Sequence, residues 1–451
     1  MMNQATANDR VFMLLSVVVV LAPMPLGSNR PWSWSLLCLL VAVIGLAWTM
    51  LVWTGRSRPG LGPTRLWPVL LPFGAALAWG AVQTVPLASP AWGHPIWKDA
   101  ADALGHPLDA TISANPFVSR TALMRLLGYG LIFFLAAQLG RKRQRAESGL
   151  RIVALACLAY CSHALAMHYL GVERLLWLPK WAYIGDATGT FVGRGAFGGF
   201  AGLGVLACLA SLIISMPTRP TRTSDRLERL FSRLIPWMTA VSVAFLAVLA
   251  SHSRGALFAT VAAVLVLLLC VTVAGLIRWR SAALFVFGLV LFGGIAIAVT
   301  GEATLARMAG EGDFIGDRPN LYRLTLVAIG DAPWMGHGLG AFEHAFKPYR
   351  DPTLPRDVIY DYAHNVWLEV VMDLGWPAGM CLLAAPAIAV GQCAAGLVRR
   401  RQDHIYCALA MAAAALFGLQ GVVDFTIQMP ALAAIFSYLL GIGYSQSWPS
   451  R

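Results

Sequence analysis

The sequence predicts an all-α, polytopic membrane protein with about twelve transmembrane helices. Of its 451 residues, 58% are hydrophobic and 12% are charged, and the mean hydropathy is +0.66, well outside the range of soluble globular domains. Apolar runs long enough to cross a bilayer recur along the whole chain, which is therefore expected to form one integral membrane domain over 1–451. The runs lie at 11–26, 33–53, 66–85, 121–139, 150–170, 195–215, 235–250, 255–276, 281–300, 366–391, 405–421 and 429–446.

The distribution of Lys and Arg orients these spans. One set of alternate loops holds 18 basic and four acidic residues, whereas the intervening loops hold 14 basic and 17 acidic ones. Because basic loops favour the cytoplasmic side, both termini are predicted to be cytoplasmic. The net charge of +12 is spread over short loops beside spans, so it does not indicate a nucleic-acid partner. The basic loops are 54–65, 140–151, 217–233, 277–280 and 399–403.

The first run is interpreted as a span rather than as a secretory signal. The sequence that follows it, PMPLGSNRPW (23–32), offers no small-x-small cleavage site. All eight cysteines fall within or at the ends of predicted spans, which does not indicate a disulfide framework or a metal cluster.

A long outer loop, 301–365, separates the ninth and tenth predicted spans. Its apolar residues predict a short amphipathic helix from about 319 to 330, ended by DAP (331–333). The next segment, GHGLGAF (336–342), precedes polar sequence rather than a Rossmann-type helix, which favours a tight turn over a dinucleotide site. The apolar residues of the expected helix are Leu321, Leu324, Leu326, Val327 and Ile329.

An arginine stands in the otherwise apolar stretch LASHSRGALF (249–258). In the predicted topology Arg254 begins the eighth span at the outer mouth, where Ser251 or Ser253 can cap the helix. The free N–H groups and the positive dipole end of the helix form an anion site, to which the guanidinium adds charge. The alternative is an interfacial arginine that reaches lipid phosphates.

Two other outward-facing helix starts carry ionisable residues. Arg194 lies in the glycine-rich stretch 186–199, at the start of the sixth span. His364 begins the tenth span and is a candidate general base, for which a neighbouring carboxylate, Asp361 or Glu369, would fix the tautomer and raise the basicity. A hydrogen-bonded interfacial histidine is the alternative. Asp424, between the last two spans, either orients a cation or caps a turn.

Together these residues suggest group transfer from a phosphate-activated, lipid-linked donor. Arg194 and Arg254 would stabilise the charge of a diphosphate leaving group, and His364 would activate a hydroxyl. The outer loops contain no Asp-x-Asp motif, so neither a divalent metal nor another cofactor is required. The topology, taken together with the family resemblance described next, implies a cavity lined by the sixth, eighth and tenth spans, beneath the helix of the long loop.

An ordered set of motifs resembles the O-antigen ligase superfamily, which includes lipopolysaccharide O-antigen ligases and O-antigen and exopolysaccharide polymerases. The resemblance implies a ligase-like core over 186–446 and a multi-pass protein of the bacterial inner membrane with a periplasmic active site. The motifs are PLGSNRPWSW (25–34), ATGTFVGRGAFGGF (187–200), SHSRGA (251–256), GDRPNLYR (316–323), GHGLGAF (336–342), AHNVWLEVVMDLGWPAG (363–379) and VDFTIQMPALA (423–433).

The resemblance also implies roles for single residues. Arg194 and Arg254 are similar to the arginines that hold the undecaprenyl diphosphate of the donor, and His364 to the histidine that activates the acceptor hydroxyl, with inversion and without a metal. Arg318 matches an arginine of the long-loop helix. The further candidates for substrate binding are Asp361, Asn365, Glu369 and Asp424.

One departure concerns Gly195 and Ala196, where many relatives carry polar side chains. The acceptor also stays open: the lipid A-core for a ligase, or the end of another lipid-linked glycan for a polymerase. The main alternative class is a twelve-helix transporter, which predicts paired halves and a long central loop, whereas the long loop here follows the ninth span. Membrane lipids are expected neighbours in every case.

Overall fold

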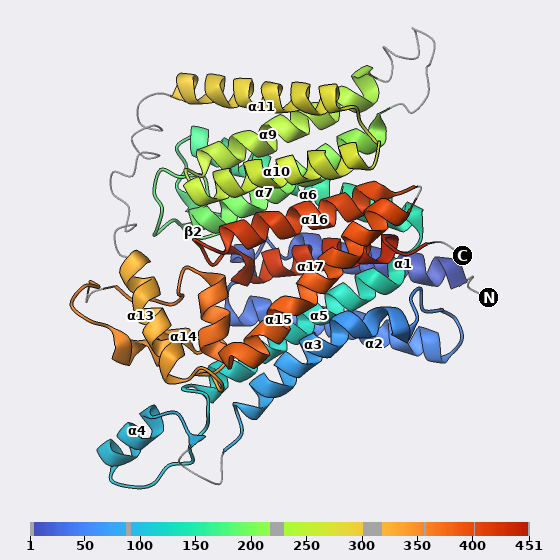
Figure 1. The fold of residues 1–451 in the computed structure, drawn as a ribbon. Coiled ribbons are helices and arrows are strands. Elements are labelled where there is room, and N and C mark those ends of the chain that lie inside the picture. The colour runs from blue at the N-terminus through green and yellow to red at the C-terminus, as the bar shows by residue number, and fades with distance from the viewer. Residues whose placement is uncertain are drawn as a thin grey trace.

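The computed structural model describes residues 4–86, 92–216, 230–300, 318–355, 358–400 and 402–449. Each predicted span coincides with a helix (Figure 1). The corresponding helices are α1 (Gln4–Leu21), α2 (Pro31–Trp53), α3 (Pro63–Val82), α5 (Pro116–Leu139), α6 (Arg143–Tyr169), α7 (Arg194–Ser215), α9 (Ile235–Ala250), α10 (Arg254–Val273), α11 (Trp279–Thr300), α15 (Val366–Arg399), α16 (His404–Gln420) and α17 (Pro430–Gln446).

The remaining elements are short and lie between these helices. A two-stranded antiparallel ladder pairs β1 (Arg174–Leu175) with β2 (Leu178–Pro179). The short helices are η1 (Leu26–Ser28), α4 (Ile96–Leu104), η3 (Leu230–Leu234), α13 (Arg318–Asp331), α14 (Phe342–Phe346), η5 (Lys347–Tyr349) and η6 (Thr426–Gln428).

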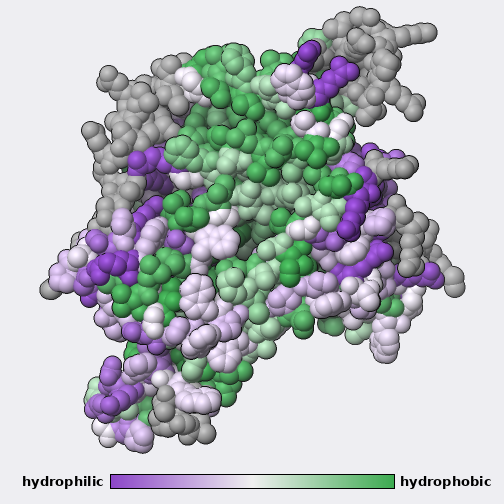
Figure 2. Space-filling model, viewed as in Figure 1, coloured by the Kyte–Doolittle hydropathy of each residue, from purple (hydrophilic) through white to green (hydrophobic). Residues whose placement is uncertain are grey.

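Seven helices in the described part of the chain are long and apolar enough to cross a membrane: α2, α3, α5, α6, α7, α10 and α15. Hydrophobic residues cover the middle of the face in Figure 2, while hydrophilic residues gather toward both helix ends. The protein is thus a mostly helical, multi-pass membrane protein. The total of about twelve spans and the cytoplasmic termini stay predictions.

The two ends of the bundle differ. The start of α1 and the end of α17 lie at one end, and the short helices α4, α13 and α14 lie at the opposite end (Figure 1). The expected loop 301–365 belongs to this second end, although its residues 301–317 lie outside the described residues.

Local sequence explains where several helices begin. Proline occupies the first position of α2, α3, α5 and α17. A backbone N–H at this position would have no acceptor within the helix, so proline, which lacks one, fits there. Asn115, Ser253 and Asn365 precede α5, α10 and α15, and the side chain of each accepts a backbone N–H from the first turn. Of the two serines expected to cap α10, Ser253 does so, with Ala256 N as donor.

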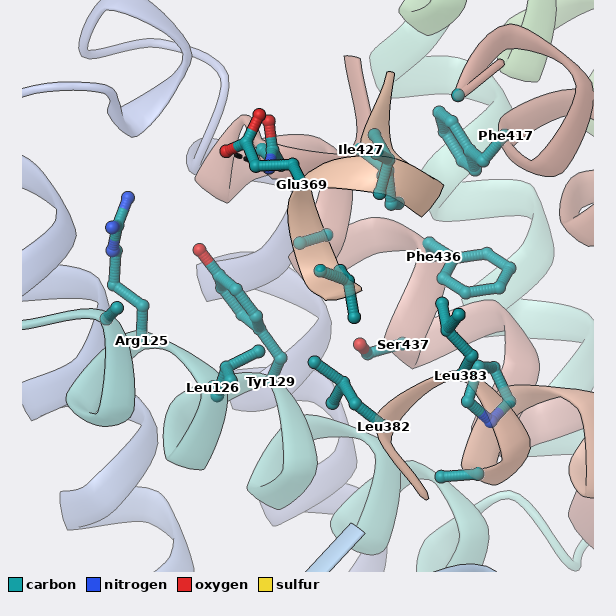
Figure 3. Close-up of a pocket in the computed structure, with 18 of the residues that line it drawn as sticks. Arg125, Leu126, Tyr129, Glu369, Leu382, Leu383, Phe417, Ile427, Phe436 and Ser437 are labelled. Atoms are coloured by element: carbon teal, nitrogen blue, oxygen red, sulfur yellow. Dashed lines mark hydrogen bonds between the residues drawn. The ribbon is translucent and has the colours of Figure 1, made fainter. Parts of the chain in front are cut away.

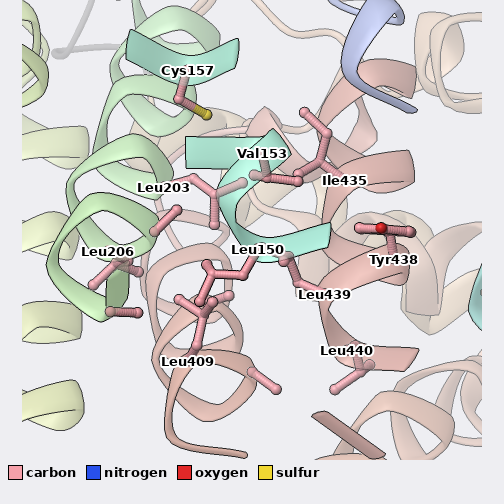
Figure 4. Packing of buried hydrophobic residues seen from close by; sticks show 14 of the residues in the cluster. Leu150, Val153, Cys157, Leu203, Leu206, Leu409, Ile435, Tyr438, Leu439 and Leu440 are labelled. Atoms are coloured by element: carbon pink, nitrogen blue, oxygen red, sulfur yellow. The ribbon is translucent and has the colours of Figure 1, made fainter. Parts of the chain in front are cut away.

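Helix α7 forms the centre of the core. It is apolar on all sides and is contacted by α6, α9, α10 and α16. Glycines in α7 allow its neighbours to approach closely. A Cβ added at Gly204 would lie 3.0 Å from Cys157 Cβ, and one added at Gly202 would overlap Thr260. Figure 4 shows Leu203 and Leu206 of α7 near side chains of α6, α16 and α17.

Helix α15 is broken at Gly375, which has φ +73° and ψ 167°. The glycine-rich segment fills the break: His337 N donates to Met372 O at 2.9 Å, and Gly338 N donates to Asp373 O at 2.9 Å. Gly336, Gly338 and Gly340 all have positive φ, which confirms the predicted tight turn. Irregular backbone at membrane depth is tolerated when protein groups satisfy it in this way.

The side chain of Gln83, at the end of α3, completes this junction. Its Nε2 donates to Met335 O at 2.7 Å and to Asp373 O at 2.8 Å, and its Oε1 accepts Leu339 N at 3.1 Å. Three segments that are distant in sequence are therefore joined by one buried amide.

The predicted loop helix is observed as α13, which packs against α15. Leu321, Leu324 and Ile329 are buried as expected. Leu326 and Val327 were wrongly assigned to the same face, because they are 53% and 49% exposed. The buried face is completed instead by small residues at the next helical turns, Thr325 and Ala328.

Candidate functional site

The starts of α7, α10, α13 and α15 meet at one loop, residues 421–429, between α16 and α17. Arg318 Nη1 donates to Val423 O at 2.8 Å. A Cβ on Gly255 would lie 3.0 Å from Val423 Cγ2, and a Cβ on Gly195 would overlap the Asp424 carboxylate. The neighbours of Arg254 and Arg194 thus contact the same loop that binds Arg318.

Arg194 is held by a buried carboxylate. Its Nη1 lies 3.3 Å from Asp186 Oδ2, and its guanidinium lies 5.7 Å from the ring centre of Tyr183. The other oxygen of Asp186 lies 2.8 Å from His252 Nδ1, and Asp186 and His252 are both 7% exposed. Asp186 therefore links the start of α7 to the turn before α10. Asp186 was not predicted as a site residue, since nothing in the local sequence marks its partner His252, 66 residues away.

His364 faces Asp424, with 3.9 Å between Nδ1 and Oδ1. Its backbone has φ +53°, and its carbonyl accepts the Tyr322 hydroxyl at 3.0 Å. Burial lowers the pKa of His364, Asp424 raises it, and Arg318 lowers it, with a net decrease. The imidazole is therefore neutral near pH 7 and can accept a proton.

The expected carboxylate partners of His364 are corrected by this geometry. Asp424, rather than Asp361 or Glu369, is the carboxylate that lies within 4 Å of the imidazole in the described part of the chain, with 3.9 Å between His364 Nδ1 and Asp424 Oδ1. Glu369 acts on the backbone before the histidine, because its Oε2 accepts Ala363 N at 2.7 Å and its Oε1 accepts Gln428 Nε2 at 2.7 Å. Asn365 Oδ1 caps α15 through Leu368 N at 3.1 Å.

A cavity of about 980 Å³ lies between α2, α3, α5, α15, α16 and α17 (Figure 3). This cavity differs from the one expected at the sixth, eighth and tenth spans, which stays a prediction. Helix α15 lines it, α10 contributes only Val266, and α7 contributes no lining residue.

The predicted site residues consequently fall into two groups. Asp361 and Glu369 line the cavity, whereas its lining includes none of the others that were assigned to the site. Those outside the lining are Arg194, Arg254, Arg318, His364, Asn365 and Asp424.

The cavity contains ionisable residues that the sequence analysis missed. Arg125 of α5 and Asp373 of α15 both line it, and the Arg125 guanidinium lies 5.0 Å from the ring centre of Trp34. Burial and the nearby Glu343 raise the pKa of Asp361. The signal was present, since Arg125 and Asp373 stand inside predicted spans, where charged residues are costly and usually functional.

Comparison with known proteins bears on the segment that contains three of the predicted site residues. A search of the curated proteins gave no match. A family model described as O-antigen ligase matches residues 239–383, a segment that contains Arg254, Arg318 and His364. The match supports the resemblance found in the sequence: residues 239–383 are similar to the O-antigen ligase family.

Proposed function

We propose that the protein is a metal-independent, inverting glycosyltransferase of the inner membrane. It would move a glycan from an undecaprenyl-diphosphate-linked donor to an acceptor sugar hydroxyl at the periplasmic face, with the lipid A-core as acceptor. The observation that carries the proposal is the neutral His364 beside Asp424, at a loop contacted by three arginine-bearing helix starts.

In the proposed reaction His364 accepts the proton of the acceptor hydroxyl as its oxygen attacks the anomeric carbon. The bond between that carbon and the diphosphate oxygen breaks, and the diphosphate leaves with the electron pair. Arg194, Arg254 and Arg318 would stabilise the growing negative charge. Asp424 would stabilise the imidazolium that forms, as a carboxylate does in other histidine-dependent reactions.

The departure from the family at Gly195 fits this assignment. The Asp424 carboxylate occupies the space that a side chain at 195 would fill. A polar group is therefore present at the start of α7 although the residue there is glycine. The Asp424 carboxylate thus takes the place that a polar side chain at position 195 has in many relatives, which supports a role for Asp424 at the site.

The experiment is complementation of a deletion strain, with lipid-linked glycan and lipopolysaccharide analysed as bands. His364→Ala and Arg254→Ala should abolish transfer at normal membrane expression, whereas His106→Ala, at an exposed loop histidine, should restore it. Normal bands with both site variants would exclude the proposed function.

The same strain distinguishes ligase from polymerase. Long polymer retained on the carrier indicates a lost ligase. Single repeat units, with or without attachment to the core, indicate a lost polymerase, which is the alternative member of the superfamily.

A further inference from the structure

Two buried histidines form a hydrogen bond at the end of the bundle that carries α4 and α13 (Figure 1). His94 precedes α4, His337 belongs to the glycine-rich segment 336–342, and the two residues are 9% and 3% exposed. The distance from His94 Nε2 to His337 Nδ1 is 3.0 Å. Neither residue takes part in the proposed glycan transfer, so their pairing needs a separate explanation.

Backbone groups fix the direction of this hydrogen bond. Ile96 N donates to His94 Nδ1 at 3.2 Å, so the proton of the His94 ring is on Nε2, which donates to His337 Nδ1. The proton of the His337 ring is then on Nε2, which donates to Ala328 O at 2.8 Å. In a neutral imidazole one nitrogen donates and the other accepts, so all four ring nitrogens are used and both rings are neutral.

Each ring accepts one hydrogen bond and donates another, so neither can take up a second proton in place. A proton on His94 Nδ1 would face Ile96 N–H, and a proton on His337 Nδ1 would face His94 Nε2–H. A buried donor that faces another donor loses its hydrogen bond, and a buried positive charge without a partner costs more still. Protonation of either ring therefore requires the pair to separate and water to enter.

Burial lowers the pKa of both histidines. It lowers the pKa of His94 to about 4, with a smaller decrease from the neighbouring His337. In His337 the hydrogen bond to Ala328 O and the charge of Asp331 raise the pKa, but burial outweighs them. Because a histidine in water has a pKa of about 6.5, the paired rings bind protons less tightly than separated, hydrated rings would.

The other titratable groups near the pair, among the described residues, are exposed, neutral or bound elsewhere. Tyr349 of η5 faces His337 with ring centres 5.8 Å apart, and burial raises the pKa of its hydroxyl, so it is uncharged. Asp373 Oδ2 accepts Gly340 N at 2.6 Å. Solvent screens the exposed Asp331 and the exposed charged residues of α4, which are Lys98, Asp99 and Asp102. The charge of the pair is therefore governed mainly by its burial.

The histidine pair closes the base of the α4 segment, residues 92–114. His94 N donates to Thr111 O at 2.8 Å, and Ala114 N donates to His337 O at 2.8 Å. Helix α4 itself contains no buried residue, so the position of the segment depends largely on contacts at its base. The pair also contacts a backbone carbonyl of α13, and separation of the rings would thus loosen the α4 segment from two neighbours.

We propose that His94 and His337 form an acid-sensitive latch, in which protonation of either ring releases the α4 segment from the glycine-rich segment and from α13. The latch is fully stable above about pH 6.5, the ordinary pKa of a separated ring, and loses stability as the pH falls toward the lower pKa of the closed pair. At pH 5, each ring that is protonated only when separated should favour opening about 30-fold. Opening of the latch is independent of glycan transfer.

The first measurement is a histidine titration by nuclear magnetic resonance, with isotope-labelled histidine in the full chain in phosphatidylcholine nanodiscs. The signals of the pair are identified by their loss in the single variants His94→Gln and His337→Gln. At pH 7.5 both rings should carry their proton on Nε2. Both should become protonated only below the ordinary value of about 6.5, and His94 by more than about one unit.

The second measurement is hydrogen exchange, corrected for the intrinsic effect of pH, at the Ile96 and Ala114 amides, which donate to the two histidines. Exchange in the unmodified protein should rise about 30-fold or more between pH 7.5 and pH 5. The double variant His94→Gln and His337→Gln lacks both titrating rings, so its exchange should change less than about threefold. His106→Gln replaces an exposed histidine of the same segment and should keep the full rise.

Three results would overturn the proposal: a protonation midpoint of either ring at or above the ordinary histidine value, a proton on Nδ1 of either ring at pH 7.5, or a full rise of exchange in the double variant. If the double variant does not fold, the unmodified protein decides, because exchange that is equal at pH 7.5 and pH 5 excludes the latch. Neither measurement involves glycan transfer, so failure of the proposed function and failure of the latch are separate outcomes.

Discussion

Replacement of Asp424 by Asn should shift the pH dependence of glycan transfer. The pair distance of 3.9 Å between His364 Nδ1 and Asp424 Oδ1 corresponds to about 1 kcal/mol at the dielectric constant of water and about 4 kcal/mol at an effective value of 20. Because the His364 side chain is 31% exposed, solvent screening favours the lower end, about 1 kcal/mol. Loss of the Asp424 charge would then disfavour protonation of the imidazole about fivefold.

The sign follows from the charge on the imidazole. Loss of the negative neighbour disfavours the protonated ring, so the pKa of His364 falls further below its ordinary value. A general base works when neutral, and the acidic limb of the rate profile should therefore move to lower pH by about one unit. The plateau rate should fall by no more than about 10-fold, since a base of lower pKa accepts the proton less readily.

The assay measures single-turnover transfer from a lipid-linked donor between pH 5 and pH 9. Asp351→Asn is the matched control, because Asp351 pairs with Arg323 on the exposed surface. An acidic limb that stays in place, or that moves to higher pH, would refute the assignment of Asp424 as the partner of His364.

Three further predictions concern the surrounding frame. Gly195→Ala places a Cβ against the Asp424 carboxylate and should reduce transfer more than 10-fold in complemented cells, whereas Gly193→Ala, which meets nothing within 4 Å, should not. Gly375→Ala forces a side chain into φ +73° and ψ 167° and should destabilise the protein by about 1–3 kcal/mol, visible as a lower thermal midpoint. Asp186→Ala leaves the buried His252 and the partly exposed Arg194 without their shared carboxylate and should destabilise the protein by about 1–3 kcal/mol. An unchanged midpoint in either variant would contradict the contacts described.

The helices could be predicted from sequence because a bilayer demands long apolar segments. The candidate helix starts could be found for a related reason, since Arg194, Arg254 and His364 are ionisable groups at the ends of such segments. Turn chemistry was equally local, and the glycines of 336–340 have the positive φ that their sequence indicated.

The partners of these residues were not local. His364 meets a carboxylate 60 residues later in the chain rather than the two in its own segment. The cavity described lies away from α7, whose glycines bring its neighbours close, and such packing cannot be predicted from a count of spans. Arg125 was not selected as a candidate, because the predicted span 121–139 that contains it is otherwise mostly apolar.

The amide of Gln83 has a consequence for how the protein is assembled. Its acceptors, Met335 O and Asp373 O, are 252 and 290 residues further along the chain. During synthesis α3 is made long before either acceptor exists. Until then, the polar side chain of Gln83 must form hydrogen bonds with water or lipid groups in the membrane. The long loop and the broken helix α15 are made later, and only then can they accept the hydrogen bonds of the Gln83 amide. We therefore expect misfolding during biogenesis to be most frequent at this last step, when the Gln83 side chain of α3 forms its hydrogen bonds with the two later segments.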